Sequence, residues 1–151
     1  MGASAKMSWG ANRLVRPLHH MDTKKLGELG EGIACEYLVN KGFKILVKNY
    51  RINFGEIDII AEKRQGLFLK KTRIIHFVEV KTIIDDSGNF FPEERVDYKK
   101  RKKLRQLAQI WLEKNSFPQN QPYQIDIIGV QVGKDIEKPK VAYFENVVGD
   151  N

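Results

Sequence analysis

The chain has 151 residues, 42% of them hydrophobic, and its formal net charge is +7 at pH 7. This length predicts one domain with a sizeable core. The single cysteine, Cys35, excludes an internal disulfide and a cysteine-based zinc site, which favours a reducing compartment. No apolar run is long enough to span a bilayer, so we expect a cytoplasmic protein with no membrane partner. The basic balance suggests a polyanionic partner.

Residues 1–22 show neither helical nor alternating apolar spacing, and they carry several basic side chains. We interpret them as a disordered basic extension or as the product of an alternative start upstream of Met21. A cloning remnant and a basic organelle-targeting leader are the other interpretations. Residues 23–148 are then expected to form the single domain.

Apolar spacing predicts two helices and five strands. The helices have apolar residues three and four apart and are expected at Leu26–Lys41 and from Pro92 onward. The strands are expected at Phe43–Val47, Glu56–Glu62, Ile74–Lys81, Gln124–Val132 and Val141–Phe144. Asn49–Phe54 is expected as a turn, and Leu67–Arg73 is either a strand extension or a protruding basic hairpin. The order of the elements predicts a layered α/β or α+β domain.

Charged residues interrupt two of the apolar strands. Glu79 and Lys81 lie two residues apart, so their side chains share one face of the sheet, and Asp58 lies in the preceding strand. A buried carboxylate is costly unless it is paired, hydrogen-bonded or bound to a cation. Two carboxylates and a lysine on neighbouring strands therefore predict a site for a hard divalent cation such as Mg²⁺. A solvated edge with a surface salt bridge is the alternative.

A third carboxylate is expected to come from the first helix. On a helical wheel Glu31 lies beside Ala34 and Leu38 at the edge of the apolar stripe, whereas Glu28 turns outward. Glu31 is therefore expected to face the sheet, although an ordinary solvated acid near a helix N-terminus is the alternative. The glycines of this helix suggest close approach of another backbone or of a ligand. His76 lies on the face opposite Glu79 and is interpreted as a packing or edge residue.

Residues 95–105 contain seven basic residues and one acid, so the positive charge is concentrated on the second helix. Lys100 lies in the middle of the apolar stripe of this helix, and we expect it to contact a phosphate or a carboxylate. The other candidates for nucleic-acid contacts point outward and are Lys99, Lys102, Lys103 and Arg105. A solubilising surface is the alternative interpretation of these side chains.

The order of Glu31, Asp58 and the pair Glu79 and Lys81 resembles the active-site pattern of the PD-(D/E)xK nuclease superfamily, which includes archaeal Holliday junction resolvases. More closely, the chain resembles the YraN-like family of uncharacterised bacterial proteins. The matching stretches are GEGIACEYL from Gly30, NYR from Asn49, GEIDII from Gly55, FVEVK from Phe77 and IDII from Ile125. The chain departs from the family at Gln124, where an arginine is usual, and in a longer hairpin between residues 60 and 77.

The resemblance implies a restriction-endonuclease-like core, with a central mixed sheet flanked by helices. It implies Mg²⁺ or Mn²⁺ bound by Asp58, Glu79 and the backbone carbonyl of Val80, with Glu31 assisting through a water or a second ion. Lys81 would position or help to deprotonate the attacking water. The implied activity is endonuclease cleavage of structured or branched DNA by a symmetric homodimer. The alternatives are a catalytically silent nucleic-acid-binding module and a protein–protein adaptor that uses the face around Trp111.

Overall fold

The computed structural model describes residues 21–67, 70–85, 97–133 and 138–147. Within these residues the chain forms two helices and five strands in the expected order. They are α1 (Thr23–Asn40), β1 (Lys44–Ile52), β2 (Gly55–Gln65), β3 (Thr72–Ile84), α2 (Tyr98–Lys114), β4 (Tyr123–Val132) and β5 (Lys140–Phe144). No helix among the described residues combines the length and the apolar character needed to cross a membrane.

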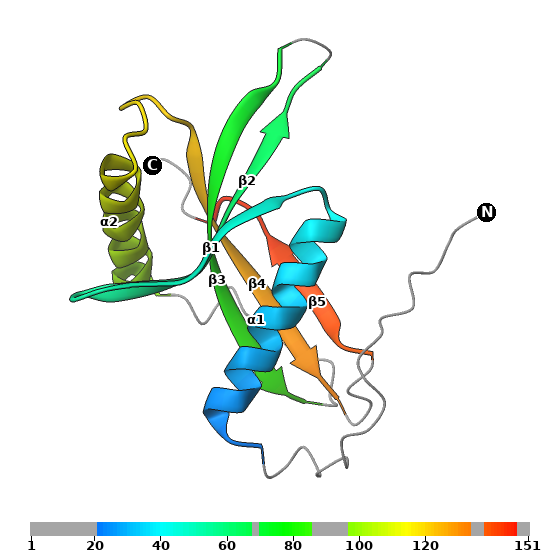
Figure 1. The fold of residues 1–151 in the computed structure, drawn as a ribbon. Coiled ribbons are helices and arrows are strands. Elements are labelled where there is room, and N and C mark those ends of the chain that lie inside the picture. The colour runs from blue at the N-terminus through cyan, green and yellow to red at the C-terminus, as the bar shows by residue number, and fades with distance from the viewer. Residues whose placement is uncertain (1–20, 68–69, 86–96, 134–137, 148–151) are drawn as a thin grey trace.

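The five strands form one mixed sheet in the order β1-β2-β3-β4-β5. Strands β3 and β4 are parallel because α2 connects them, and the other neighbouring pairs are antiparallel. The sheet lies between the two helices (Figure 1). The structure thus confirms the expected central mixed sheet flanked by helices.

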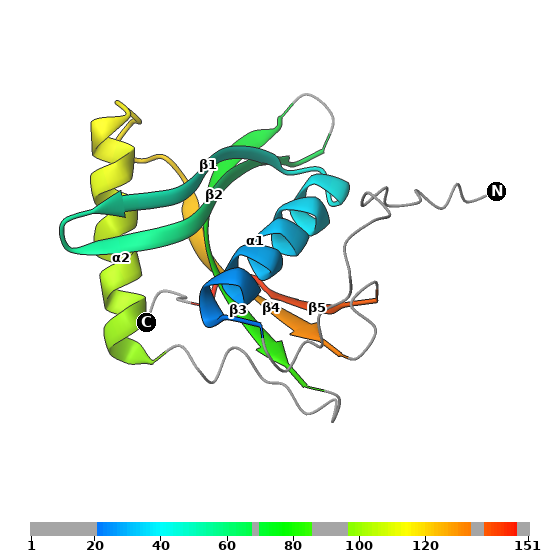
Figure 2. The same ribbon diagram turned by 60° about the horizontal axis from the view of Figure 1, so that its bottom comes forward.

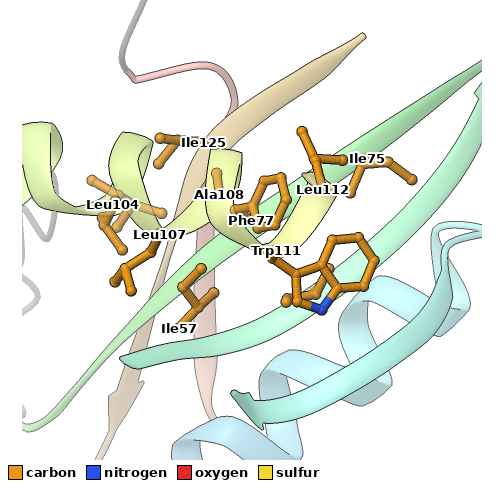
Figure 3. Packing of buried hydrophobic residues seen from close by; sticks show 11 residues of the cluster. Ile57, Ile75, Phe77, Leu104, Leu107, Ala108, Trp111, Leu112 and Ile125 are labelled. Carbon is orange, nitrogen blue, oxygen red and sulfur yellow. The ribbon is translucent and has the colours of Figure 1, made fainter. Parts of the chain in front are cut away.

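Each helix closes a separate core cluster on its own face of the sheet. Phe77 and Val78 are consecutive in β3, so they point to opposite faces and belong to different clusters. Val78 lies with Leu38 of α1, whereas Phe77 lies with Trp111 of α2 (Figure 3). The Phe77 and Trp111 rings meet edge to face with centroids 5.7 Å apart, and Trp111 is 5% exposed. Trp111 is therefore core, and it does not offer the adaptor surface that the sequence suggested.

Gly30 allows α1 to approach the sheet closely. A Cβ atom at this position would lie 1.7 Å from the Thr82 hydroxyl oxygen, so only glycine fits there without a shift of β3 or α1. Added Cβ atoms at Gly27 and Gly32 would meet open space. At one of the three glycines α1 therefore lies close to another segment, and the atoms that it meets there belong to a side chain rather than to a backbone or a ligand.

The turn is shorter than the expected Asn49–Phe54, because β1 continues to Ile52 and β2 begins at Gly55. Asn49 takes a left-handed backbone conformation with φ of 53°, which asparagine tolerates better than most residues. Its neighbours Lys48 and Tyr50 still pair with Ile59 and Ile57 of β2. The polar residues of this stretch therefore mark a local distortion inside a long hairpin.

Strands β2 and β3 also form a longer hairpin than the sequence indicated. Their pairing continues to Gln65↔Thr72, so both interpretations hold: Thr72 and Arg73 extend β3, and the paired strands form a protruding hairpin (Figure 1). Arg73 of β3 forms an ion pair with Glu62 of β2 beside this end. The basic hairpin is thus a regular extension of the sheet.

The start of the second helix differs from the expectation. Helix α2 begins at Tyr98, and the Asp97 carboxylate accepts a hydrogen bond from the Lys100 N–H at 2.8 Å. An aspartate in this place satisfies an N–H that the first turn of a helix leaves without a partner. The predicted helix start at Pro92 lies outside the described residues, as do residues 1–20 of the predicted extension.

Candidate active site

Strand β2 separates from β3 at Asp58. The paired register of the two strands ends at Ile59↔Val78, and Asp58 is the next residue. From here β2 continues with β1 toward α2 (Figure 2). Ile57 and Ile59 belong to clusters on opposite faces, although residues two apart in a regular strand share a face. Strand β2 therefore turns over at Asp58, and a fork opens between β2 and β3.

The Asp58 carboxylate lies inside this fork. Its Oδ2 atom accepts a hydrogen bond from the Val80 N–H at 2.7 Å. In an extended strand the N–H and C=O of one residue point to the same edge, so the Val80 carbonyl also faces the fork. The fork thus brings together Asp58 and Val80, as the predicted metal site requires.

Glu79 projects from β3 toward α2 and is 3% exposed. Its Oε1 atom accepts a hydrogen bond from Lys81 Nζ at 2.8 Å and forms an ion pair with Lys100 Nζ at 3.1 Å. Its Oε2 atom is buried without a hydrogen-bond partner among the described residues. The expected carboxylate contact of Lys100 is confirmed, and one oxygen of Glu79 keeps its capacity to bind a cation.

Burial and the charge of Glu79 both disfavour the ionised form of the Asp58 carboxyl group. Burial raises the pKa of Asp58 from its ordinary value of 3.8 to about 7, and the negative charges of Glu79 and Glu31 act in the same direction. The hydrogen bond from Val80 and the positive charge of Lys100 lower that pKa and only partly compensate. The site therefore favours a proton or another cation next to Asp58.

Glu31 is half-buried on α1, whereas Glu28 is exposed, as the helical wheel predicted. Glu31 acts on Asp58 through its charge. However, no cluster of three or more His, Cys, Asp or Glu side chains close enough to hold a metal ion occurs in the described part of the chain. The structure therefore shows Lys81 on Glu79, and the charges of Glu79 and Glu31 acting on Asp58, while a role of Glu31 in metal binding stays a prediction.

The oxygen atoms of the fork fit Mg²⁺. This ion prefers oxygen ligands, keeps several waters and is commonly bound through one or two protein carboxylates together with substrate phosphates. Asp58 supplies one carboxylate, and the buried, unpartnered Oε2 atom of Glu79 supplies another oxygen. Binding of Mg²⁺ by these two residues stays a prediction.

The basic residues of α2 differ in their surroundings. Lys100 is half-buried and holds Glu79, whereas Lys99, Lys102, Lys103 and Arg105 are exposed. An added Cβ atom at Gly55 would lie 2.8 Å from Lys103 Cε, so this lysine lies over the start of β2. Contact between these side chains and nucleic acid stays a prediction.

A buried polar network that the sequence did not reveal lies on the α1 side of the sheet. The Asp126 carboxylate is fully buried and accepts a hydrogen bond from the Tyr143 hydroxyl at 2.7 Å, and its Oδ2 atom lies 2.7 Å from His76 Nδ1. Gln124 and the Asn146 N–H hold its second oxygen. Burial and the negative charge of Asp126 raise the pKa of Tyr143. His76 is thus a packing residue, as expected, and the acid within IDII was the available signal for the network.

The family model described as "Uncharacterised protein family UPF0102" matches residues 30–130. The chain belongs to this family. UPF0102 comprises the YraN-like proteins that the motifs indicated, so the predicted family is confirmed.

Curated relatives match over most of their length. A UPF0102 protein of Alkaliphilus oremlandii is 44% identical over 126 residues, which cover 82% of this chain and 97% of the relative. A UPF0102 protein of Caldanaerobacter subterraneus subsp. tengcongensis is 42% identical over 116 residues, covering 76% and 86%. Among solved structures, the MspJI restriction endonuclease in complex with a 27-mer oligonucleotide matches with a TM-score of 0.32 and 16% identity, over 75% of this chain and 21% of that chain.

Proposed function

We propose that this UPF0102 protein is a divalent-metal-dependent nuclease that hydrolyses phosphodiester bonds in DNA and that has a restriction-endonuclease-like core. One observation carries the proposal: the Val80 N–H holds the Asp58 carboxylate in the fork of the sheet, and Glu79, the residue before Val80, has a buried oxygen without a partner among the described residues. Two ammonium groups lie beside these acids. The motif resemblance to PD-(D/E)xK nucleases agrees with this assignment.

Asp58, Glu79 and the carbonyl of Val80 would hold the ion. The chemistry that a bound Mg²⁺ or Mn²⁺ supplies is polarisation of the scissile phosphate and a lower pKa of the attacking water. The hydrogen bond from the Val80 N–H fixes the Asp58 carboxylate in the fork, so the ligand is oriented before the ion binds. The raised pKa of Asp58 means that the ion replaces a proton, which makes its binding stronger at alkaline pH.

The two lysines have separate roles. Lys81 comes from the same strand as Glu79, and its ammonium group is held at 2.8 Å from Oε1, where it orients the attacking water. Lys100 comes from α2 and stabilises the negative charge that develops on the phosphate oxygens. Both ammonium groups are held by one carboxylate, so they are positioned before the substrate arrives.

The exposed basic side chains of α2 give the proposed DNA contacts. Lys99, Lys102, Lys103 and Arg105 project from the helix that also carries Lys100. Contacts of this kind neutralise backbone phosphates without reading the base sequence, so affinity would fall steeply with rising salt. Selectivity would then come from DNA shape, with branched DNA as the proposed substrate and a homodimer as the proposed assembly.

A catalytically silent nucleic-acid-binding module is the second candidate function. It is favoured by one observation, which is that no third ligand-type side chain joins Asp58 and Glu79 within the described residues. Such a module would keep the salt-dependent binding of α2 and would lack metal-dependent turnover.

The deciding experiment incubates purified protein with labelled single-stranded, duplex, flap and four-way-junction DNA, in Mg²⁺, in Mn²⁺ and in EDTA. We expect metal-dependent cleavage by the wild-type protein and none by Asp58→Asn or Lys81→Ala. The matched control is Glu28→Gln, because Glu28 is an exposed acid on α1. Binding without cleavage of any substrate would decide for the silent module, and equal cleavage by homogeneous Asp58→Asn protein would refute the site.

A further inference from the structure

A pocket of about 320 Å³ lies between the β1–β2 hairpin and α2. Figure 2 shows the end of this hairpin lying across the helix. The volume is at the lower end of the range for pockets that bind small organic groups. Its lining combines three apolar side chains, three basic ones, one acid and one glycine, which are Ile52, Leu104, Leu107, Arg51, Lys100, Lys103, Glu56 and Gly55.

The basic side chains of the pocket differ in whether they form ion pairs. Arg51 is paired with Glu56 at 3.1 Å, and Lys100 is paired with Glu79. Lys103 forms no ion pair with any residue that the structure describes. The pocket therefore has one ammonium group without an ion-pair partner among the described residues, and it is lined by the apolar side chains of Ile52, Leu104 and Leu107, its apolar floor. This combination suits a ligand with a flat apolar part and an anionic part.

Exposed aromatic side chains come from the same two elements. Four large hydrophobic side chains are exposed among the described residues, and two of them are aromatic: Phe54 at 42% and Tyr98 at 77%. Phe54 directly precedes Gly55 of the pocket. Tyr98 begins α2, and at about 3.6 residues per turn it lies on the opposite side of the helix from Lys100, Lys103 and Leu107 of the pocket. Aromatic side chains beside a basic groove are the platforms on which unpaired bases stack.

We propose that this pocket receives an unpaired nucleotide of the DNA strand that is cleaved. The inference rests on the proposed nuclease function and names its substrate class: DNA with a single-stranded segment. A base within a duplex has both faces stacked and one edge paired, so it cannot reach the apolar floor or Phe54. An unpaired base has both faces accessible, and its phosphates lie within reach of Lys103.

Lys100 connects this pocket to the candidate active site. It lines the pocket and also lies 3.1 Å from Glu79 Oε1. A nucleotide held in the pocket therefore has a neighbouring phosphate close to Asp58 and Glu79. The pocket selects strands that have an unpaired nucleotide next to the phosphate to be cleaved.

The test measures binding in EDTA, so it does not depend on cleavage. Fluorescence anisotropy compares one labelled single strand with the duplex of the same sequence, for the wild-type protein and for Phe54→Ala. We expect tighter binding of the single strand, and the variant is expected to lose about 5- to 100-fold in single-strand affinity while its duplex affinity stays within about 2-fold. The matched control is Leu67→Ala, because Leu67 is an 80% exposed side chain at the turn of the other hairpin.

A second measurement locates the unpaired nucleotide. A single base-free nucleotide is placed in turn at each position of the strand. We expect removal of the base at one position to weaken binding to the wild-type protein. The same removal should not weaken binding to Phe54→Ala further, because the stacking contact between that base and Phe54 is already lost in this variant. A free nucleoside monophosphate serves as a competitor, and it is expected to compete far less well than the strand.

The outcomes separate the two proposals. Equal affinity for single strand and duplex, or equal losses on both in Phe54→Ala, would overturn the pocket assignment and leave the nuclease proposal standing. Competition by the free nucleotide as strong as that by the strand would assign the pocket to mononucleotides instead. Failure to bind any nucleic acid would overturn both proposals.

Discussion

Replacing Asp58 with asparagine should stabilise the metal-free protein while abolishing its proposed activity. Asparagine keeps a side-chain oxygen that can accept the hydrogen bond from the Val80 N–H, but it carries no charge. Burial and the charge of Glu79 make the ionised Asp58 carboxylate unfavourable in the folded state. Removing that charge therefore removes this unfavourable electrostatic energy from the folded state.

The size of the effect follows from the pKa of Asp58. Below about pH 3 the carboxyl group is largely protonated in both the folded and the unfolded chain, so it contributes no cost. As the pH rises toward 7 the unfolded chain loses this proton first, and the stability of the wild-type protein falls. Above the folded pKa of about 7 the cost is complete, and the shift from 3.8 corresponds to at most about 4 kcal/mol. For a chain of this length, that is roughly 10 °C in melting temperature.

Urea unfolding in EDTA at acidic and alkaline pH measures this difference. We expect wild type and Asp58→Asn to be equally stable near pH 3, and the variant to be more stable above about pH 8. The control is Glu56→Gln in the same strand, because Glu56 is half-exposed and its ion pair with Arg51 is worth at most about 1 kcal/mol. A stability difference that does not change with pH, or a less stable Asp58→Asn at alkaline pH, would refute the reasoning.

Addition of Mg²⁺ extends the same experiment. An ion that binds only the folded state raises stability according to its concentration and affinity. We expect Mg²⁺ to raise the melting temperature of the wild-type protein at alkaline pH and to leave that of Asp58→Asn unchanged. An equal rise in both proteins would place the bound ion elsewhere.

Three further predictions concern the remainder of the molecule. Gly30→Ala should lower the free energy of unfolding by about 1–3 kcal/mol, because the added Cβ atom would collide with Thr82. Gly32→Ala should raise the free energy of unfolding by up to about 1 kcal/mol, because its Cβ atom meets open space. Urea unfolding of both variants tests this. Reversing Lys102 and Lys103 to glutamate should make the slope of log affinity against log salt shallower by about 2, and an unchanged slope would exclude α2 as the phosphate contact. Asp126→Ala should cost about 3–5 kcal/mol in the same unfolding assay, because it leaves buried donors unpaired, and a loss below about 1 kcal/mol would contradict that role.

Local patterns in the amino-acid sequence are sufficient for much of this structure. Periodicity places both helices and all five strands, because a helix or strand that buries one face must repeat apolar residues at its own spacing. The same rule puts Glu79 and Lys81 on one face, and it turns Lys100 inward, where it meets Glu79. These relations involve residues close in the chain or repeated along one element.

Tertiary contacts decide the parts that give the site its chemistry. The fork exists because β2 turns over at Asp58 and leaves β3, and no local pattern encodes the point at which two strands separate. The hydrogen bond from Val80 to Asp58 and the pairing of His76 with Asp126 join residues from different strands. Likewise, Lys103 reaches Gly55 only because α2 packs across the hairpin. Contacts between segments far apart in the chain depend on how all elements pack at once, so they require the folded structure.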